Sequence, residues 1–347
     1  MNAPFESIAG ALVLPQPYLL FLGDTTESGF AKTAFGLRDW AANKCVGEFA
    51  CGATVTTGLP TLTPGQAVAR GARSLVIGVA NPGGVIPPSW LPSLVEAMEA
   101  GLDIIAGMHM RLADIPELNE AARRLGRQLI DIRVPPPHIP VATGRKRSGK
   151  RLLTVGTDCA LGKKYTALAI ARAFAARGLN SDFRASGQTG IMIAGGGIPM
   201  DAVVSDFEAG AAELLSPDAA PDHWDVIEGQ GSLAHPAYAA VSLGLLHGSQ
   251  PDVFVVCHEP GRTEMLGTAG YMLPSIEEVI DMTIMLGRRT NPAIRCGGIS
   301  LNTAELSAEA AAALIASETL RMGLPVADPM RGGPALEDLV DYCLAAA

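Results

Sequence analysis

The sequence of 347 residues lacks an apolar run long enough to cross a membrane, although hydrophobic residues make up 48% of it. A membrane-spanning helix needs about 20 consecutive apolar residues, and polar residues interrupt the apolar stretches here before that length is reached. Residues 1–10 also lack the basic start and the long apolar stretch that are typical of a signal peptide. We therefore expect a cytoplasmic protein that has no membrane as a partner.

Basic residues are also few, because 26 Lys and Arg face 35 Asp and Glu and the formal charge is −9. A nucleic-acid partner requires a basic face, so this composition argues against nucleic-acid binding. One basic cluster stands out at residues 145–151. It is short, and it fits either a solvated linker or a local contact to an anion.

The cysteines lack the paired spacing of a metal site, and we expect them to be reduced thiols. Most of them stand in or beside apolar runs, where a free cysteine usually acts as a small buried hydrophobe. Cys159 is an exception because it lies in a glycine-rich loop. The six positions are Cys45, Cys51, Cys159, Cys257, Cys296 and Cys343.

What the sequence does contain is a regular alternation of apolar runs, bounded by Gly and Pro, with amphipathic segments. This pattern is typical of an α/β fold in which strands and helices alternate around a mostly parallel sheet. The first half has candidate strands at residues 18–22, 75–79, 103–107 and 129–132, and candidate helices at 64–71 and 90–100. Residues 134–150 have no periodicity and indicate a linker, so we predict one domain at residues 1–140 and a second at 141–347.

The second half begins again with a strand, and its pattern predicts further strands in parallel. Candidate strands are at residues 151–155, 181–185, 225–228, 252–257, 298–301 and 325–327, with a helix at 163–177. In such folds the ligand lies beyond the carboxyl ends of the strands. We therefore expect the loops that follow these strands to form the site.

The strongest local signal is the loop between the strand at 151–155 and the helix at 163–177. It comprises Gly156, Thr157, Asp158, Cys159, Ala160, Leu161, Gly162 and Lys163. In a strand–loop–helix unit, backbone N–H groups and the helix N-terminus converge on one point, and a lysine adds a full positive charge. The loop therefore predicts a binding site for a pyrophosphate.

The loop departs from the common GxxxxGK[ST] pattern in two ways, and these narrow the choice of ligand. The first glycine is one residue further from the lysine, and in this the loop resembles that of the dethiobiotin synthetase group of P-loop proteins. The residue after Lys163 is Lys164, where Ser or Thr would hold Mg²⁺ on a nucleotide. A charged lysine does not ligate Mg²⁺, so we expect no obligatory metal and a metal-free phosphate ligand. Coenzyme A is one such ligand, and Lys164 or Tyr165 would contact its ribose phosphate or adenine.

Polar residues follow the other strands at the same predicted edge. Glu228 ends a strand and precedes a glycine-rich turn with Ser232 and His235, and Arg262 and Gln188 follow two further strands. Glu228 fits either a catalytic carboxylate or a partner of Lys163. His235 fits a general base, and a guanidinium such as that of Arg262 suits a substrate carboxylate. His258, at the end of the strand before Arg262, fits an ordinary loop histidine.

In the first half, Lys32 and Arg111 each follow a strand. Taken singly, each fits a solvated surface residue. Their shared position at strand ends makes them candidate contacts for a carboxylate or phosphate at a domain interface, where small-molecule pockets are common.

Together these motifs resemble the DUF1611 family, and the resemblance covers essentially the whole chain. It rests on the glycine loop, on Glu228-Gly229-Gln230-Gly231-Ser232-Leu233 with His235-Pro236, on His258-Glu259-Pro260-Gly261-Arg262 and on Ala31-Lys32-Thr33-Ala34. The family implies an N-terminal Rossmann-like domain and a C-terminal P-loop NTPase-like domain. Its members include D-glutamate N-acetyltransferases, which use acetyl-CoA in bacterial D-glutamate utilisation.

The resemblance implies an acyltransferase that moves the acetyl group of acetyl-CoA to the amino group of D-glutamate. Glu228 or His235 would deprotonate the ammonium, and backbone N–H groups of residues 229–232 would stabilise the oxyanion. Lys32, Arg111, Gln188, Ser232 and Arg262 are the candidate substrate contacts. Direct transfer needs fewer assumptions than an acetylated Cys159.

The alternatives are an ATP- and Mg²⁺-dependent ligase or kinase that resembles dethiobiotin synthetase, and a binding protein without turnover. The apolar content also favours a homo-oligomer.

Overall fold

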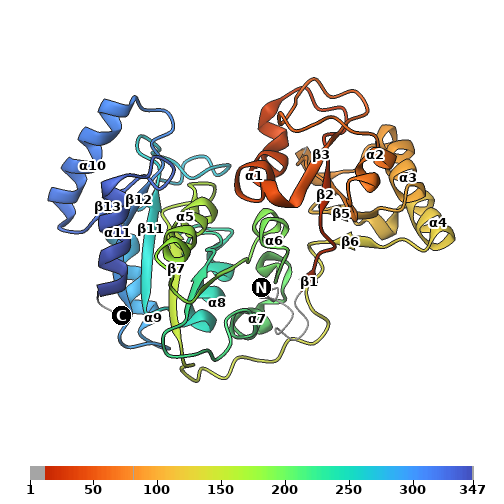
Figure 1. Cartoon of the computed structure of the whole chain (residues 1–347). Helices are drawn as coiled ribbons and strands as arrows, with labels where there is room; N and C mark the ends of the chain where they lie inside the picture. Colours follow the sequence, from red (N-terminus) through yellow and green to blue (C-terminus); the bar gives the residue numbers. More distant parts are fainter. Residues whose placement is uncertain (1–11, 81, 346–347) are drawn as a thin grey trace. The chain divides into compact units, whose positions relative to one another are not determined.

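The computed structural model describes residues 12–80 and 82–345, which form two compact units (Figure 1). The first unit contains residues 12–136 together with Gln188–Ala202, and the second contains Pro137–Gly187 together with the rest of the chain. Each unit is built around its own parallel sheet, so the predicted α/β class is confirmed. In the described ranges, no helix is both long and apolar enough to span a membrane.

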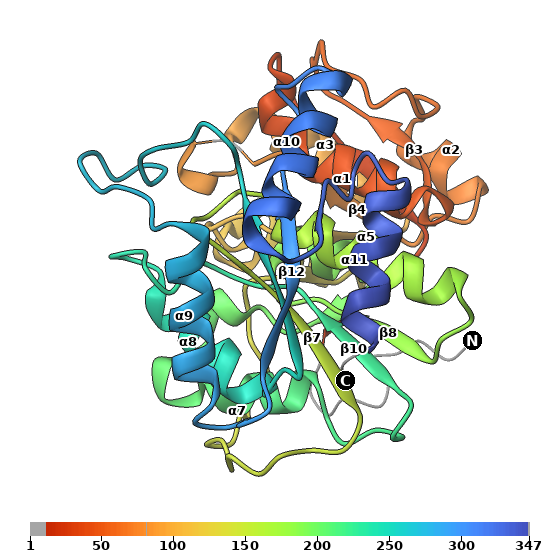
Figure 2. The same cartoon turned by 90° about the vertical axis from the view of Figure 1, so that its left-hand side faces the viewer.

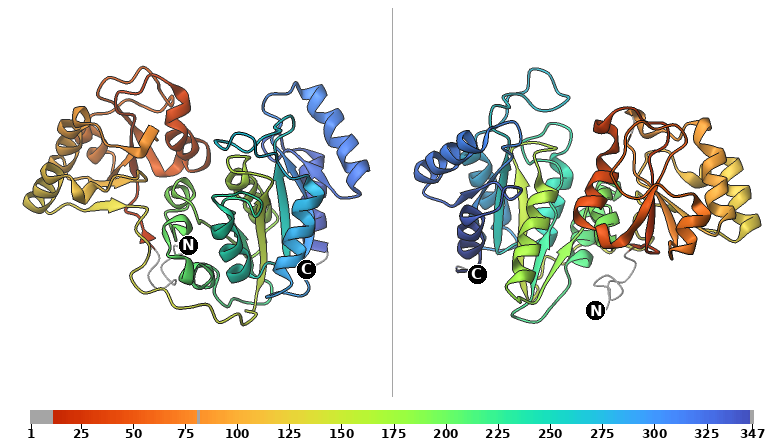
Figure 3. Two further views of the ribbon diagram at one scale, coloured as in Figure 1. Left: turned by 180° about the vertical axis from the view of Figure 1, so that it is seen from behind. Right: turned by 45° about the horizontal axis from the view of Figure 1, so that its top comes forward.

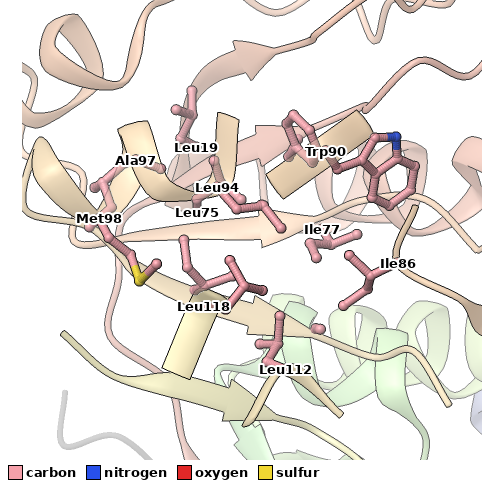
Figure 4. Packing of buried hydrophobic residues seen from close by; sticks show 14 of the residues in the cluster. Leu19, Leu75, Ile77, Ile86, Trp90, Leu94, Ala97, Met98, Leu112 and Leu118 are labelled. Atoms are coloured by element: carbon pink, nitrogen blue, oxygen red, sulfur yellow. The ribbon is translucent and has the colours of Figure 1, made fainter. Parts of the chain in front are cut away.

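The first unit is a five-stranded sheet with order β3-β2-β4-β5-β6, in which every pair is parallel. Its strands are β2 Tyr18–Phe21, β3 Cys45–Phe49, β4 Ser74–Ile77, β5 Asp103–Ala106 and β6 Leu129–Asp131. Its helices include α1 Lys32–Trp40, α2 Pro64–Ala69, α3 Leu91–Glu99 and α4 Pro116–Leu125. Figure 4 shows the core, in which Leu19, Leu75 and Ile77 of the sheet pack against Leu94 of α3 and Leu118 of α4. The four predicted strands are present to within two residues at either end.

Strand β3 was not among the predicted strands, because Gly47 and Glu48 interrupt its apolar pattern. Glu48 is buried, and its carboxylate accepts hydrogen bonds from Thr56 Oγ1 and from both the N–H and the hydroxyl of Thr57. These partners lie eight and nine residues further along the chain. A charged residue in a strand is stabilised here by contacts that the local pattern does not reveal.

At the point where the strand order of the first sheet reverses, between β2 and β4, Trp90 is buried. Its Nε1 donates to Asp24 Oδ1 at 2.8 Å, and a Cβ on Gly23 would lie only 2.5 Å from the indole ring. A dinucleotide in a Rossmann fold requires its pyrophosphate to approach glycine backbone at this kind of position. In this unit the indole ring covers the backbone of Gly23 instead.

Residues of the C-terminal half complete the first unit. After strand β8 the chain forms α6 Gln188–Ala194 and strand β9 Gly196–Gly197, and β9 pairs antiparallel with β1 Leu12–Val13. Lys44 Nζ donates to the carbonyl oxygens of Ile193 and Ala194 at the end of α6, at 2.9 and 2.8 Å. The two units therefore interleave along the chain, and a single domain boundary at residue 140 stays a prediction.

The second unit is a six-stranded parallel sheet with order β13-β12-β11-β7-β10-β8. Its strands are β7 Lys150–Gly156, β8 Ser181–Arg184, β10 Trp224–Ile227, β11 Val253–His258, β12 Arg295–Leu301 and β13 Val326–Ala327. Its helices are α5 Lys163–Ala176, α7 Glu208–Leu215, α8 Ala239–Ser249, α9 Ile276–Gly287, α10 Ala308–Met322 and α11 Pro334–Ala345. Helices α5 and α11 pack together, as do α7 with α8 and α8 with α9, so that the sheet lies between helices (Figures 2 and 3).

The basic segment before β7 is bound to this unit, and the expectation of a solvated linker is wrong for Arg147 and Arg151. Both are buried, and the Arg147 guanidinium donates to the carbonyl of Ser216 at 2.6 Å and to that of Gly248 at 2.7 Å. Ser216 follows α7, and Gly248 lies in the last turn of α8. A cation at helix C-termini satisfies carbonyl groups that have no partner within the helix.

Candidate active site

The predicted strand–loop–helix unit is present, with β7 ending at Gly156 and α5 beginning at Lys163. Two residues of the loop have left-handed backbone conformations, Ala160 with φ 56° and Gly162 with φ 110°. A non-glycine residue in this region costs about 1 kcal/mol, and such strain is typical of loops that hold a ligand. The loop therefore has the local geometry of a phosphate-binding loop.

Lys163 lies inside this loop and is almost completely buried. Its Nζ donates to the main-chain carbonyl of Asp158 at 2.6 Å. Burial lowers the pKa of Lys163, since removal from water disfavours the charged amine. Its stem runs beside Gly229, where a Cβ would lie 1.7 Å from the carbonyl oxygen of Thr154, so only glycine fits. A phosphate at the loop would offer the amine a charged acceptor.

The Asp158 side chain, which has no exposed surface, is held by hydrogen bonds from neighbouring loops. Its Oδ2 accepts from Leu266 N at 2.8 Å and from Arg262 Nη1 at 3.2 Å, and its Oδ1 accepts from Cys159 N at 2.6 Å. Arg262 also donates to the carbonyl of Cys159 at 2.9 Å and to Glu259 at 2.7 Å. In this structure Arg262 therefore stabilises the loop that contains Asp158.

His235 is buried against the same loop, and its two ring nitrogens differ. Its Nδ1 accepts the N–H of Ala237 at 3.1 Å, so in the neutral ring Nε2 carries the hydrogen. Nε2 lies 3.8 Å from Asp158 Oδ1 and has no hydrogen-bond partner among the described residues. The ring also lies against Tyr238, with 4.6 Å between the ring centroids. His235 thus presents a buried donor without an acceptor.

Glu228 connects the loops that follow β8 and β10. Its Oε2 accepts the N–H groups of Ser186 and Gly187 at 3.0 and 2.9 Å, and its carbonyl accepts the Ser186 hydroxyl at 2.5 Å. Gln230 Nε2 donates to the same hydroxyl at 2.9 Å. Glu228 is buried and serves as a hydrogen-bond acceptor.

Ser232 and His258 both contact Thr157, near the start of the phosphate loop. Ser232 Oγ donates to the carbonyl of Thr157 at 3.2 Å, and the hydroxyl of Thr157 lies 3.0 Å from His258 Nδ1. Burial lowers the pKa of His258, which favours the neutral ring. The sequence singled out Ser232 but gave no reason to connect His258 with the loop.

Lys164, Tyr165 and Cys159 lie on the partly exposed side of the loop and the helix that follows it. Lys164 Nζ lies over the ring of Tyr165, 4.4 Å from its centroid. Burial raises the pKa of the Cys159 thiol. A thiol is a good nucleophile only as the thiolate, so the surroundings of Cys159 work against a nucleophilic role.

In the part of the chain that the structure describes, two clusters place acidic and His or Cys side chains close enough for a metal ion, but neither fits one. In the first, ligand atoms of Asp158, Cys159 and His235 lie within 4.8 Å of one another. A metal ligand needs the lone pair of Nε2, whereas the Ala237 N–H bond leaves the hydrogen there. In the second cluster, Asp182, His223 and Asp225, Arg184 donates to Asp225 at 2.6 Å and supplies the positive charge.

The structure brings Glu228, Ser232, His235 and Arg262 together around residues 156–165. Lys32, Arg111 and Gln188 belong to the first unit, where Lys32 begins α1 and Gln188 begins α6. Gln188 Nε2 donates to Asp201 at 2.6 Å, and both Lys32 and Arg111 are exposed. Their role as substrate contacts stays a prediction.

Family models match both halves of the chain. A "DUF1611_N Rossmann-like domain" matches residues 41–135, and a "DUF1611_C P-loop domain" matches residues 140–340; both are described as domains of unknown function. A crystal structure of a DUF1611 family protein from Anabaena variabilis ATCC 29413 is similar, with a TM-score of 0.81 and 34% identity. The match covers 96% of this chain and all of that one.

Two curated relatives are similar over nearly their whole length, and both are named D-glutamate N-acetyltransferase. The relative from Tritonibacter scottomollicae is 50% identical over 324 residues, which cover 92% of this chain and 97% of the relative. The relative from Pseudoalteromonas sp is 48% identical over 318 residues, which cover 91% and 96%.

Proposed function

The chain belongs to the DUF1611 family, and we propose that it is a D-glutamate N-acetyltransferase that takes its acetyl group from acetyl-CoA. The observation that carries this proposal is the identity of about half of all residues, over more than nine tenths of the chain, to two relatives of that name. The activity predicted from the sequence is supported by both relatives. Neither name points to the alternative of an ATP-dependent ligase or kinase.

The phosphate loop supports coenzyme A as the carrier of the acetyl group. Lys163, the N-terminus of α5 and the loop N–H groups suit a pyrophosphate, and Lys164 stands where a nucleotide enzyme would hold Mg²⁺. A second lysine adds positive charge that suits the additional 3′-phosphate of coenzyme A. We assign Lys164 and Tyr165 to that part of the donor.

The chemistry requires a proton acceptor for the ammonium group of D-glutamate, since only the free amine attacks a thioester. The amine nitrogen then bonds to the acetyl carbon, the carbon–sulfur bond breaks, and the coenzyme A thiolate leaves and takes up the proton that the nitrogen loses on becoming an amide. We assign proton acceptance to Glu228, whose buried carboxylate is held in position by the N–H groups of Ser186 and Gly187. We assign a donor role to His235, because Nδ1 is bonded to Ala237 N–H and Nε2 carries the hydrogen.

Stabilisation of the oxyanion by the 229–232 turn needs a donor other than Gly229, since Gly229 N already donates to Thr154 Oγ1 at 2.9 Å. The Nε2–H of His235 is a further donor beside the turn. Removal of one preorganised donor typically slows acyl transfer by about 10²–10³. His235 is therefore our candidate for this role.

Direct transfer from donor to amine is favoured over an acetylated Cys159. The raised pKa of Cys159 disfavours the thiolate, and the nearby His235 has its Nδ1 lone pair bonded to a backbone N–H. For the two carboxylates of D-glutamate we keep Lys32, Arg111, Gln188, Ser232 and Arg262 as candidates. We also propose that the enzyme acts in the cytoplasm as a homo-oligomer.

The test is to incubate the purified protein with acetyl-CoA and D-glutamate, L-glutamate or no amino acid, without added Mg²⁺, and to follow the free thiol. Thiol release with D-glutamate alone is the expected result. No release with any amino acid from the folded protein would refute the activity. Mg²⁺-dependent release of phosphate from ATP would then identify the ligase or kinase alternative.

A further inference from the structure

A short hairpin, residues 262–273, follows β11 and leads to α9 in the second unit. Its strands are joined by an antiparallel bridge between Glu264 and Met272 and by the bond from Met265 N to the carbonyl of Tyr271 at 2.9 Å. In Figure 2 the segment that leads into α9 projects outward from the rest of this unit. The hairpin is thus a projection that adds little to the core.

Large apolar side chains on this hairpin are exposed to solvent. Leu266 is 57% exposed, Tyr271 53% and Met272 64%, whereas Met265, which precedes Leu266, is buried. Single exposed apolar residues are normal, but several on one short projection indicate a surface that binds something apolar.

The backbone of the same hairpin is bonded to the phosphate loop. Leu266 N donates to Asp158 Oδ2 at 2.8 Å, and Arg262, where the hairpin begins, donates to the carboxylate of Asp158 and to the carbonyl of Cys159. The exposed apolar surface therefore starts beside the residues assigned to the pyrophosphate. A ligand that extends from the loop along the hairpin would contact both.

A groove lies at the base of the hairpin, where Gly261 and Ser275, which flank the hairpin in the chain, contribute to its lining. His258, which is bonded to Thr157, lines it together with the apolar side chains of Pro260, Ile276, Leu301 and Leu314. The charged residues of the groove are Glu277, Glu318 and Arg321, two carboxylates against one guanidinium that bonds to both.

This charge balance determines which parts of the donor and the substrate the groove can bind. A groove with an excess carboxylate and apolar walls disfavours the 3′-phosphate of coenzyme A and the carboxylates of D-glutamate. It suits a neutral chain with apolar and amide groups. The pantetheine arm is the neutral part of the donor, and it must extend from the pyrophosphate to reach the substrate.

We propose that the hairpin of residues 262–273, with the groove at its base, binds the pantetheine arm of the acyl donor. This site rests on the proposed function, because it requires coenzyme A on the phosphate loop. Contact with the arm would bury the exposed side chains of Leu266 and Met272. The alternative occupant of the same surface is a second copy of the chain.

The experiment compares two double variants by calorimetric titration with coenzyme A and with 3′-phosphoadenosine 5′-diphosphate, which lacks the pantetheine arm. One variant is Leu266→Ser with Met272→Ser, which keeps the N–H of residue 266 that bonds to Asp158. The matched control is Leu320→Ser with Met285→Ser, which removes a leucine and a methionine exposed on α10 and α9.

We expect the hairpin variant to bind coenzyme A about tenfold or more weakly, because apolar contact with the arm is lost. It should bind the armless nucleotide like the wild type, and the control variant should bind both ligands normally. Unchanged affinity for coenzyme A, or an equal loss of affinity for both ligands, would refute the proposed pantetheine site and leave the proposed function standing. A change in sedimentation of the ligand-free hairpin variant would identify the surface as an interface between copies and overturn the proposal. If the wild-type chain does not bind coenzyme A, the proposal that acetyl-CoA is the acyl donor is refuted as well.

Discussion

His235 Nε2 lies 3.8 Å from Asp158 Oδ1, and neither side chain has appreciable exposed surface. The distance is too long for a hydrogen bond, which leaves a buried N–H group without an acceptor among residues 12–80 and 82–345. Such a group destabilises a folded protein by about 1–3 kcal/mol. A ligand oxygen that accepts this hydrogen would recover that free energy on binding, so His235 favours the ligand-bound state.

For His235, we expect the substitution His235→Gln to retain far more activity than His235→Ala. A glutamine amide nitrogen can take the place of Nε2 as a donor, whereas alanine removes the donor and should lower kcat/KM by about 10²–10³. The measurement is kcat/KM against pH, with His138→Gln as a control at an exposed histidine. If His235 is the base, His235→Gln will be as inactive as His235→Ala.

The variant Glu228→Gln should lose catalysis and keep its fold. Its amide oxygen can still accept the N–H groups of Ser186 and Gly187, but the amide accepts no proton. We expect kcat to fall by about 10²–10⁴ and the free energy of unfolding to stay within about 1 kcal/mol of the wild type. Steady-state kinetics and urea unfolding measure the two quantities, and Glu309→Gln, at an exposed position on α10, is the control. Wild-type kcat in Glu228→Gln would assign the base to another group.

Lys163→Met should weaken binding of acetyl-CoA without an effect on the KM for D-glutamate. Methionine fills the buried channel of the lysine stem and removes the charge that bonds to the carbonyl of Asp158. Loss of a charge-assisted contact to phosphate predicts weaker binding by about 10–100-fold. Titration with coenzyme A measures this change. Equal affinity would show that the loop does not hold the pyrophosphate.

Cys159→Ser should leave kcat/KM within about threefold of the wild type, since the raised pKa disfavours the thiolate form. Intact mass measurement of the wild type after incubation with acetyl-CoA alone should show no acetylated enzyme. An acetyl group on Cys159, together with an inactive serine variant, would establish a two-step transfer instead.

Burial of His258 predicts a loss of stability in acid. The folded chain holds its pKa below the ordinary value of about 6.5, so the unfolded chain takes up a proton first as the pH falls. The stability contribution is complete above pH ~6.5 and declines below it, by at most about 1.4 kcal/mol per pH unit. Urea unfolding of wild type and His258→Asn at pH 7.5 and 5.5 measures the difference. Parallel pH dependence in both proteins would contradict the prediction.

Much of the architecture could be predicted because the residues that determine these strands and loops lie close together in the sequence. Apolar runs with glycine-rich ends predicted the strands of both parallel sheets except β3, and the phosphate loop follows from spacing alone. Strand β3 was not predicted, because the hydrogen bonds that stabilise its buried Glu48 come from hydroxyl and N–H groups of Thr56 and Thr57, which lie in a loop. The burial of Arg147 depends likewise on the carbonyl of Ser216, which no local pattern indicates.

For the site, the sequence predicted which residue types gather but not how their hydrogen bonds are distributed. Arg262 was expected at a substrate carboxylate, and the structure bonds it to Asp158 and Glu259. The choice between base and donor for His235 depends on the backbone N–H of Ala237, whose direction is a matter of tertiary structure. The residue types limit the chemistry that the site can perform, whereas the role of each residue depends on its hydrogen bonds in the folded structure.

The segment Gln188–Ala202 has a consequence for how the chain is made. It contains β9, the partner of β1 at Leu12–Val13, and the end of α6 that binds Lys44. During synthesis on the ribosome, the first unit lacks these parts until residue 202 has left the exit tunnel. By then strands β7 and β8 of the second unit have already been translated. The first unit is therefore complete only after part of the second has been made, so completion of the two units is coupled in time.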